Sequence, residues 1–324
     1  MTNDRPTRRE MLARIGSAGL AAAGVAGGAV WLNSRPGFRG RATVTTIPSF
    51  AVDLEAGRPA MVIARGPDPA VLVRGIFEEM GGIGSFVGEG DRVLVKPNAA
   101  FDRPVWQAAT TNPEVLGAVV AECRKAGAAE VVVTDNPIHA PEGCFRKTGL
   151  GKATEDAGGR VVLPGPRQFT NVALPGTILD GWETLTGPLD GITKVIGIAP
   201  VKDHNLAKAS LTLKNWYGLL GGPRNRLHQR IDDAIADLGV LMRPTLSILD
   251  GTRILFRNGP TGGSPDDVKV GDVIAASIDG VALDAFGTTL LDLDPADVGY
   301  LGLAEAKGVG TADWASLSPK EIAG

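Results

Sequence analysis

Residues 110–137 read TTNPEVLGAVVAECRKAGAAEVVVTDNP, a pattern that predicts a helix followed by a strand. Asn112-Pro113 is typical of a helix start, apolar residues then recur at helical spacing, and Gly127 is typical of a helix end. The β-branched run that starts at Glu130 predicts a strand. Residues 92–95 predict another strand just before this stretch. Together they predict a strand–helix–strand unit.

The same alternation of short apolar strands and amphipathic helices continues along the chain. Further strands are expected at residues 61–64, 195–201, 246–249 and 273–278. Further helices are expected at residues 70–80, 226–241 and 282–291. Residues 159–195 carry four prolines and no helical periodicity, so they predict a β-rich insertion. The expected fold class is α/β, with a mainly parallel sheet and helices on both faces.

The N-terminal residues differ from the rest of the chain. Residues 7–12 read TRREML, and a weakly apolar stretch rich in Ala and Gly follows, as in a twin-arginine export signal. We expect residues 1–33 to be such a signal or an uncleaved N-terminal anchor, residues 34–60 a tether and extended entry, and residues 61–324 one domain. A short amphipathic helix or a membrane span are the alternatives. The expected location is periplasmic or extracytoplasmic, with the translocase as a transient partner and membrane contact only through this segment.

Composition excludes several classes of protein. The chain has 324 residues, 44% of them hydrophobic and 21% charged, which is ordinary for a folded domain. Its net charge of −3 and the lack of a basic patch argue against nucleic-acid binding. Two cysteines are too few for an iron–sulfur cluster or a four-cysteine zinc site. A disulfide between Cys123 and Cys144 stays open, although Cys123 falls in a predicted helix and is typical of a small buried hydrophobe.

Polar residues follow five of the expected strands. They are Lys96-Pro97-Asn98, Asp135-Asn136, Lys202-Asp203-His204, Asp250-Gly251 and Asp279-Gly280. If these strands are parallel neighbours, their ends share the edge at which open α/β sheets bind ligands. Asp-Gly and Asp-Asn are also common turn sequences, so the aspartates alone fit either interpretation.

The lysines and the histidine at these strand ends point more directly to chemistry. Lys96 follows three apolar residues, and a buried ammonium needs a carboxylate, an anionic ligand or a route to solvent. In an extended backbone Lys202 and His204 point the same way and Asp203 the other way. Asp203 is therefore not expected to orient His204. General base, metal ligand and structural histidine all stay open for His204.

His228 stands at the start of a predicted amphipathic helix. It is either a binding residue or a surface residue paired with Asp232, one helical turn away. The standard signatures of serine hydrolases, P-loop proteins, zinc proteases and dinucleotide-binding folds are absent from the sequence.

Eight short motifs, in order, resemble the DUF362 family, a domain of unknown function. They are DRVLVKPN at 91–98, TTNPEVLGAVV at 110–120, VVVTDNP at 131–137, PVKDH at 200–204, LKNWYG at 213–218, ILDG at 248–251, NGPTGG at 258–263 and DGVALDA at 279–285. The resemblance implies a site made of Lys96, Asn98, Asp135, Lys202, His204, Lys214, Asn215, His228, Asp250 and Asp284. Many relatives carry ferredoxin-like cysteine motifs, which this chain lacks, so no iron–sulfur cluster is expected.

These observations favour an exported enzyme that acts on a small anionic substrate. The expected catalytic residues are Lys96, Lys202 and His204, and the expected substrate-binding residues are Asn98, Lys214, Asn215 and His228. Asp135, Asp250 and Asp284 would orient the lysines or bind a divalent cation such as Mg²⁺, Mn²⁺ or Zn²⁺. The alternatives are a non-catalytic protein that binds a solute or metal, and a redox partner with an organic cofactor.

Overall fold

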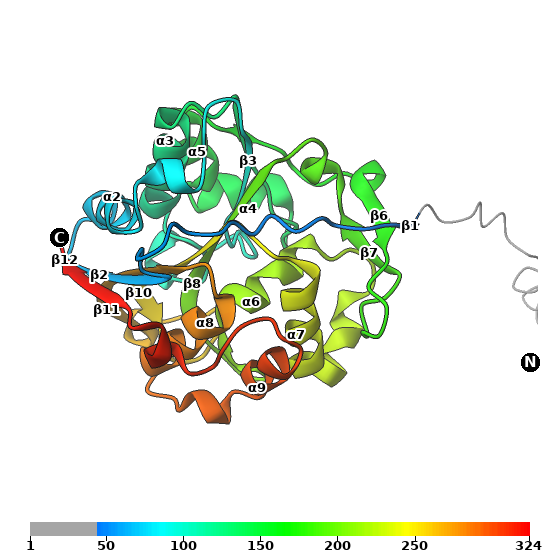
Figure 1. Cartoon of the computed structure of the whole chain (residues 1–324). Coiled ribbons are helices and arrows are strands. Elements are labelled where there is room, and N and C mark those ends of the chain that lie inside the picture. Colours follow the sequence, from blue (N-terminus) through cyan, green and yellow to red (C-terminus); the bar gives the residue numbers. More distant parts are fainter. Residues whose placement is uncertain (1–43) are drawn as a thin grey trace, which may run out of the picture. The chain divides into compact units, whose positions relative to one another are not determined.

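In the computed structural model, which describes residues 44–324, a nine-stranded sheet is covered by helices on both faces (Figure 1). The strand order is β12-β2-β11-β10-β8-β3-β4-β5, and the short β9 pairs with β8 outside this path. The mainly parallel α/β fold expected from the sequence is therefore confirmed. The expectations about residues 1–33 lie outside the described residues.

The strands and helices have the following bounds. The large sheet contains β2 (Met61–Arg65), β3 (Arg92–Lys96), β4 (Glu130–Val133), β5 (Arg160–Val161), β8 (Lys194–His204), β9 (Lys208–Ser210), β10 (Leu246–Leu255), β11 (Val268–Ser277) and β12 (Lys320–Ala323). The helices are α2 (Pro69–Glu79), α3 (Pro113–Lys125), α4 (Pro141–Lys147), α5 (Leu150–Asp156), α6 (Thr212–Asn215), α7 (Ile231–Leu241), α8 (Gly280–Thr289) and α9 (Gly299–Ala306).

Two strands of the large sheet, β11 and β9, run antiparallel to their neighbours. A parallel neighbour needs a crossover connection, usually a helix. Between β10 and β11 the chain forms only a short turn of 3-10 helix at Pro265–Asp267, so it turns straight back. Asp279 therefore follows β11 at the opposite edge of the sheet, where its side chain accepts hydrogen bonds from Val281 and Ala282 and caps α8. The expectation that Asp279 shares an edge with the other four strand ends is wrong.

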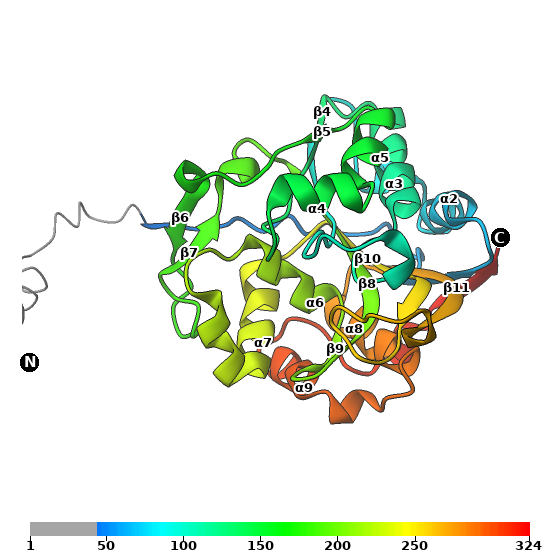
Figure 2. The same cartoon turned by 180° about the vertical axis from the view of Figure 1, so that it is seen from behind.

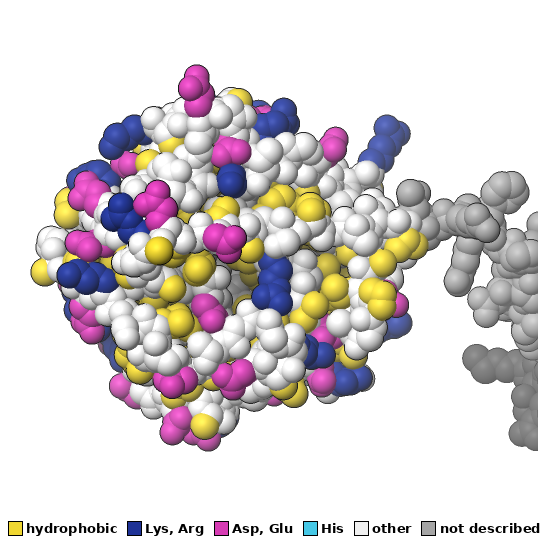
Figure 3. All heavy atoms as spheres, in the orientation of Figure 1, with side chains coloured by type: hydrophobic (Ala, Val, Ile, Leu, Met, Phe, Trp, Pro, Cys, Tyr) yellow, Lys and Arg dark blue, Asp and Glu magenta, His cyan; other side chains and the backbone are white. Residues whose placement is uncertain are grey.

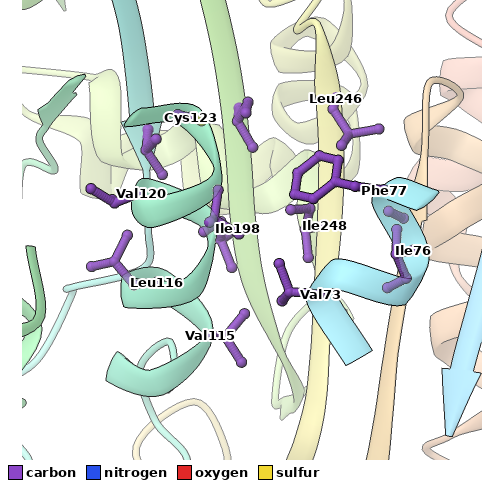
Figure 4. Close-up of a cluster of buried hydrophobic side chains, with 14 of the residues drawn as sticks. Val73, Ile76, Phe77, Val115, Leu116, Val120, Cys123, Ile198, Leu246 and Ile248 are labelled. Atoms are coloured by element: carbon purple, nitrogen blue, oxygen red, sulfur yellow. The ribbon is translucent and has the colours of Figure 1, made fainter. Parts of the chain in front are cut away.

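Alternating side chains divide the apolar core between the two faces of the sheet. On one face, Phe77 of α2 and Leu116 of α3 pack against Ile198 and Ile248 of the central strands, as Figure 4 shows. On the other face, residues of β2, β8, β10 and β11 pack against α8, and residues of β3, β4 and β8 pack against α7. Each central strand is thus buried on both sides, which explains its continuous apolar sequence.

The two cysteines are both buried and both free thiols. Cys123 belongs to the core beneath α3, as its position in an amphipathic helix suggested (Figure 4). Burial raises the pKa of the Cys123 thiol to about 12 and that of Cys144 to about 11.

A smaller sheet forms from the β-rich insertion predicted for residues 159–195. It contains β6 (Phe169–Val172) and β7 (Trp182–Leu185), with β1 (Val44–Thr45) beside β6. From β1 the chain runs without regular structure to β2, and Phe50 in this segment is buried. Its amide donates to the Arg243 carbonyl (2.8 Å), and its carbonyl accepts from the Thr245 hydroxyl (2.8 Å). Among residues 44–324, every helix is too short or too polar to cross a membrane.

Candidate functional site

The carboxyl ends of β3, β4 and β8 surround a cavity of about 600 Å³. The hairpin β8–β9 and the short helix α6, which contribute to its wall, can be followed in Figure 2. The lining includes eight of the ten predicted site residues, all except Asp250 and Asp284. These eight are Lys96, Asn98, Asp135, Lys202, His204, Lys214, Asn215 and His228. Further residues of the lining include Phe101, Ile138, Leu206, Tyr217, Gly218, Arg224 and Pro260.

Lys96 and Asp135 form a buried ion pair at the base of the cavity. The Lys96 Nζ lies 2.7 Å from the Asp135 Oδ1, and both side chains are almost completely buried. The Lys96 ammonium also donates to the Pro97 carbonyl (2.8 Å) and to the Asn215 Oδ1 (3.0 Å). Burial lowers the pKa of Lys96, and Asp135 opposes that effect. The sequence-based expectation that Lys96 needs a partner is thus met by a carboxylate from the neighbouring strand.

Lys202 is equally buried but has no carboxylate partner among residues 44–324. Its Nζ donates to the Ala109 carbonyl (2.7 Å) and to the Asn98 Oδ1 (3.2 Å), and it lies 5.4 Å from the centre of the Phe101 ring. An ammonium has three donors, so one remains for a ligand. Burial, reinforced by the charge of Lys214, lowers the pKa of Lys202 to about 7.

Two asparagines connect the two buried lysines. The Asn215 Oδ1 accepts from Lys96 (3.0 Å) and from the Asn98 Nδ2 (3.1 Å), while the Asn98 Oδ1 accepts from Lys202 (3.2 Å). The Asn215 Nδ2 donates to the Ile198 carbonyl (3.1 Å). These bonds fix both amides and hold the two ammonium groups in defined positions, which makes the floor of the cavity a preorganised one.

Two more cations reach the cavity without a carboxylate partner in the described part of the chain. Lys214 is half-buried, and its Nζ lies 4.9 Å from the centre of the Tyr217 ring. Burial, together with the charge of Arg224, lowers the pKa of Lys214 to about 8. The Arg224 guanidinium donates only to backbone carbonyls, those of Asn136 (2.8 Å) and Pro137 (2.7 Å) being the shortest bonds.

The cavity therefore carries an excess of positive charge. Four cationic side chains and one carboxylate line it, which leaves three positive charges when the lysines are protonated. The whole protein has a net charge of −3, and on the face shown in Figure 3 acidic and basic side chains are interspersed. A concentration of unpaired cations in one cavity attracts anions and is costly when the cavity holds none.

His204 lines the cavity as a neutral imidazole. Its Nδ1 accepts hydrogen bonds from the amides of Leu206 (3.1 Å) and Ala207 (3.2 Å), so the ring proton is on Nε2. Burial and the nearby charges of Lys214 and Lys202 lower the pKa of His204 to about 3. Because Nδ1 is already occupied, this histidine can donate a hydrogen bond to a ligand but is a poor general base. Asp203 points away and accepts from the Gly259 amide (2.9 Å), as the strand alternation indicated.

His228 and His139 have aromatic or carboxylate neighbours. The His228 ring stacks on Tyr217, with 6.2 Å between ring centres, rather than pairing with Asp232. His139 lies outside the cavity, with its Nδ1 2.7 Å from the Asp102 Oδ1 and its ring edge-to-face with Phe101. His228 is therefore part of the cavity wall, and His139 supports a residue of the wall.

Asp250 and Asp284 do not line the cavity but accept hydrogen bonds from backbone amides. Asp250 accepts from the Asn112 amide (2.7 Å) and from the Thr252 hydroxyl (2.7 Å), so it holds the start of α3. Asp284 accepts from the amides of Thr212 (2.7 Å) and Leu213 (3.0 Å) and holds the start of α6. Burial raises the pKa of Asp284 to about 7, against these hydrogen bonds.

The structure does not bring the three aspartates of the expected divalent-cation site together. Asp135 pairs with Lys96, while Asp250 and Asp284 belong to separate hydrogen-bond networks. Within residues 44–324, no three His, Cys, Asp or Glu side chains lie close enough to hold a metal ion. The expectation is wrong because the buried carboxylates of Asp250 and Asp284 accept hydrogen bonds from nearby backbone amides. The sequence does not indicate these contacts.

Sequence reasoning did not find Arg224, Tyr217 and Phe101 as residues of the site. Arg224 lies in a stretch of 3-10 helix (Arg224–Arg230) that follows Gly221-Gly222-Pro223. An arginine after such a turn is ordinarily solvated, so only its contacts reveal the role. Tyr217 belongs to the LKNWYG motif, and its position in that motif was the one available signal.

Comparison with known proteins identifies a family that the chain matches. A family model described as "Domain of unknown function (DUF362)" matches residues 93–289. A thylakoid-associated protein of Synechocystis sp. is 28% identical over 253 residues, which are 73% of this chain and 74% of the relative.

Two solved structures are distantly similar. The lactate racemase apoprotein of Thermoanaerobacterium thermosaccharolyticum has 14% identity and a TM-score of 0.42 over 74% of this chain. A protein of Thermotoga maritima has 12% identity and a TM-score of 0.39 over 75% of this chain. The match spans 60% of the length of each of these two solved chains.

Proposed function

The chain belongs to the DUF362 family, and we propose that it binds a small anion in the cavity at the carboxyl ends of β3, β4 and β8 and acts on it as an enzyme. The observation that carries this proposal is the set of three cations, Lys202, Lys214 and Arg224, that face one cavity without a carboxylate partner in the described chain. An anionic group placed among them would receive several charge-assisted hydrogen bonds.

Lys202 is the group best suited to proton transfer in this site. Its pKa of about 7 allows it to give and take a proton near neutral pH. The Lys96 ammonium, in contrast, is held by a carboxylate and two further acceptors, so its role is to position Asn215 and Asp135. His204 would donate its Nε2 proton to the anion as a hydrogen bond and keep that proton throughout.

A non-catalytic binding protein is the second candidate. The neutral His204, with its Nδ1 occupied by two amides, favours it, because this imidazole is then a poor general base. Incubating the protein with the small molecules that it retains on purification separates the two candidates. Chemical change of a retained molecule, followed by mass spectrometry, supports the enzyme, and an unchanged molecule supports the binding protein.

Isothermal titration calorimetry with sulfate and phosphate tests the anion site itself. Both ions are expected to bind, and Lys214→Met is expected to weaken both by about tenfold or more, since a charge-assisted hydrogen bond contributes about 1.5–3 kcal/mol. Lys125→Met, at an exposed lysine outside the cavity lining, serves as the matched control and should leave both affinities unchanged. Absence of binding by both ions would contradict the proposal.

Sulfate affinity is expected to fall as the pH rises, by about tenfold between pH 6 and pH 9. The protonated forms of Lys202 and Lys214 bind the anion, and their pKa values of about 7 and about 8 place the loss in that range. Sulfate is the suitable probe because its own charge is constant over this interval. Calorimetry at constant ionic strength measures the effect, and an affinity that stays level from pH 6 to pH 9 would count against binding by these lysines.

We also propose that the chain is exported by the twin-arginine route and works close to a membrane. The sequence of residues 7–12 supports export, and the name of the Synechocystis relative places that protein at a membrane. Replacing both Arg8 and Arg9 with lysine is expected to leave the protein in the cytoplasm. Cell fractionation and immunoblotting of the two forms measure this, and unchanged export of the double variant would speak against the route.

A further inference from the structure

Part of the rim of the cavity is apolar, in contrast to its cationic floor. Ile138 and Leu206 line the cavity and are 64% and 53% exposed. Ile138 belongs to the loop that follows β4, and Leu206 belongs to the turn between β8 and β9. Two separate elements therefore place a large apolar side chain at the same opening.

Backbone hydrogen bonds hold both rim residues in place. The Ile138 amide donates to the Ala100 carbonyl (2.9 Å), and the Leu206 amide donates to the His204 Nδ1 (3.1 Å). Phe101, which is almost buried, lies deeper in the same lining and places its ring near the Lys202 ammonium. Apolar side chains thus line the cavity both at its exposed rim and beside the buried Lys202 ammonium.

The volume of the cavity also exceeds what an inorganic anion needs. At about 600 Å³ it falls within the range of about 300–1,000 Å³ found for sites of drug-sized ligands. Sulfate or phosphate would occupy the floor and leave the apolar rim in contact with water. A ligand that covers Ile138 and Leu206 would remove that apolar surface from water, which is favourable.

We propose that the natural ligand is an amphiphilic anion, with its charged group on the Lys202–Lys214–Arg224 floor and an apolar chain or ring against Phe101, Ile138 and Leu206. This inference rests on the proposed anion site and adds the class of ligand. The shared chemistry, an anionic head with an apolar tail, fits either a free water-soluble amphiphile or a lipid of a bilayer.

A series of ligands with one headgroup and increasing chain length tests the inference. Inorganic phosphate and the ethyl, butyl and hexyl monophosphates, each below its aggregation concentration, are titrated into the full chain at one pH. Affinity is expected to rise about fourfold for each methylene group that the rim buries. Equal affinities across the series would overturn the amphiphilic ligand and leave the anion site intact, whereas no binding by any of them would overturn both proposals.

Variants of the rim give the second readout. Leu206→Ser and Ile138→Ser are each expected to weaken hexyl phosphate binding by about 16-fold, as for the loss of about two methylene contacts, with phosphate affinity unchanged. Val270→Ser is the matched control, because Val270 is 73% exposed and lies outside the cavity lining. Equal loss of phosphate and hexyl phosphate affinity in the rim variants would contradict the proposal.

Vesicles distinguish the two sources of the ligand. Sedimentation with phosphatidylcholine vesicles that contain phosphatidic acid, reversed by hexyl phosphate and reduced by Leu206→Ser, would support a bilayer lipid. Binding of hexyl phosphate without vesicle binding would support a free amphiphile. If neither hexyl phosphate nor Leu206→Ser reduces vesicle binding, the cavity is not the site that recognises the lipid.

Discussion

Lys202→Met is expected to weaken sulfate binding by about 10- to 150-fold without lowering the free energy of unfolding. The loss of affinity follows from the removal of a charge-assisted hydrogen bond worth about 1.5–3 kcal/mol. The stability is preserved because the Lys202 ammonium is buried without a carboxylate, and methionine fills similar space without a charge. Calorimetry measures the first effect and urea denaturation the second.

The pH at which the denaturation is measured matters for this variant. Burial lowers the pKa of Lys202 to about 7, whereas the unfolded chain keeps the ordinary value of about 10.4. Between these values the unfolded state binds more protons, so the stability of the native protein rises with pH. Any increase in the free energy of unfolding caused by Lys202→Met should therefore be largest below pH 7 and shrink as the pH approaches 10.

Lys96→Met is the matched control, since the same substitution is made at the other buried lysine. It leaves the Asp135 carboxylate buried without its ion pair, which costs about 3–5 kcal/mol. The two variants are thus expected to differ in stability although both remove one buried ammonium. Similar destabilisation by both substitutions would show that Lys202 also stabilises the fold. It would contradict the expectation that Lys202→Met does not lower the free energy of unfolding.

Sequence reasoning predicted the part of the site that depends on strand ends. Lys96 ends β3, Asp135 follows β4 and Lys202 lies near the end of β8. These three strands are parallel neighbours, so their ends meet. The opposite direction of Asp203 and His204 also follows from the alternation of a strand. The local sequence pattern was sufficient here because these strands are parallel neighbours, as the prediction assumed.

The failures arose where a distant contact or a change of direction decided the outcome. The sequence predicts Asp279 at the wrong edge because β10 and β11 form a hairpin. The lack of a predicted helix between these two strands is the feature of the sequence that indicates the hairpin. The sequence predicts Asp250 and Asp284 as ligands, but each accepts hydrogen bonds from backbone amides at a helix start. Arg224 comes to the site through carbonyl contacts from the loop after β4, which no spacing in the sequence indicates.

Gly218→Ala is expected to destabilise the protein by about 3–5 kcal/mol and to abolish sulfate binding. A Cβ added at Gly218 would overlap the Asp135 Oδ1 and lie 2.6 Å from the Lys96 Nζ. The backbone at this position cannot easily retreat, because the Gly218 carbonyl accepts from the Asn136 amide (2.8 Å). The added methyl group would therefore separate Lys96 from Asp135 and disturb Asn215, which links the ion pair to the rest of the floor.

Gly143→Ala provides the control for this substitution. Gly143 lies in α4, and a Cβ there would meet no atom within 4 Å. Alanine at that position should stabilise the protein by about 0.5–1 kcal/mol, because it restricts the unfolded chain and favours the helix. Urea denaturation of both variants and calorimetry with sulfate give the comparison. A Gly218→Ala protein that is as stable as the parent and still binds sulfate would show that the close approach of this backbone to the ion pair is not required for the site.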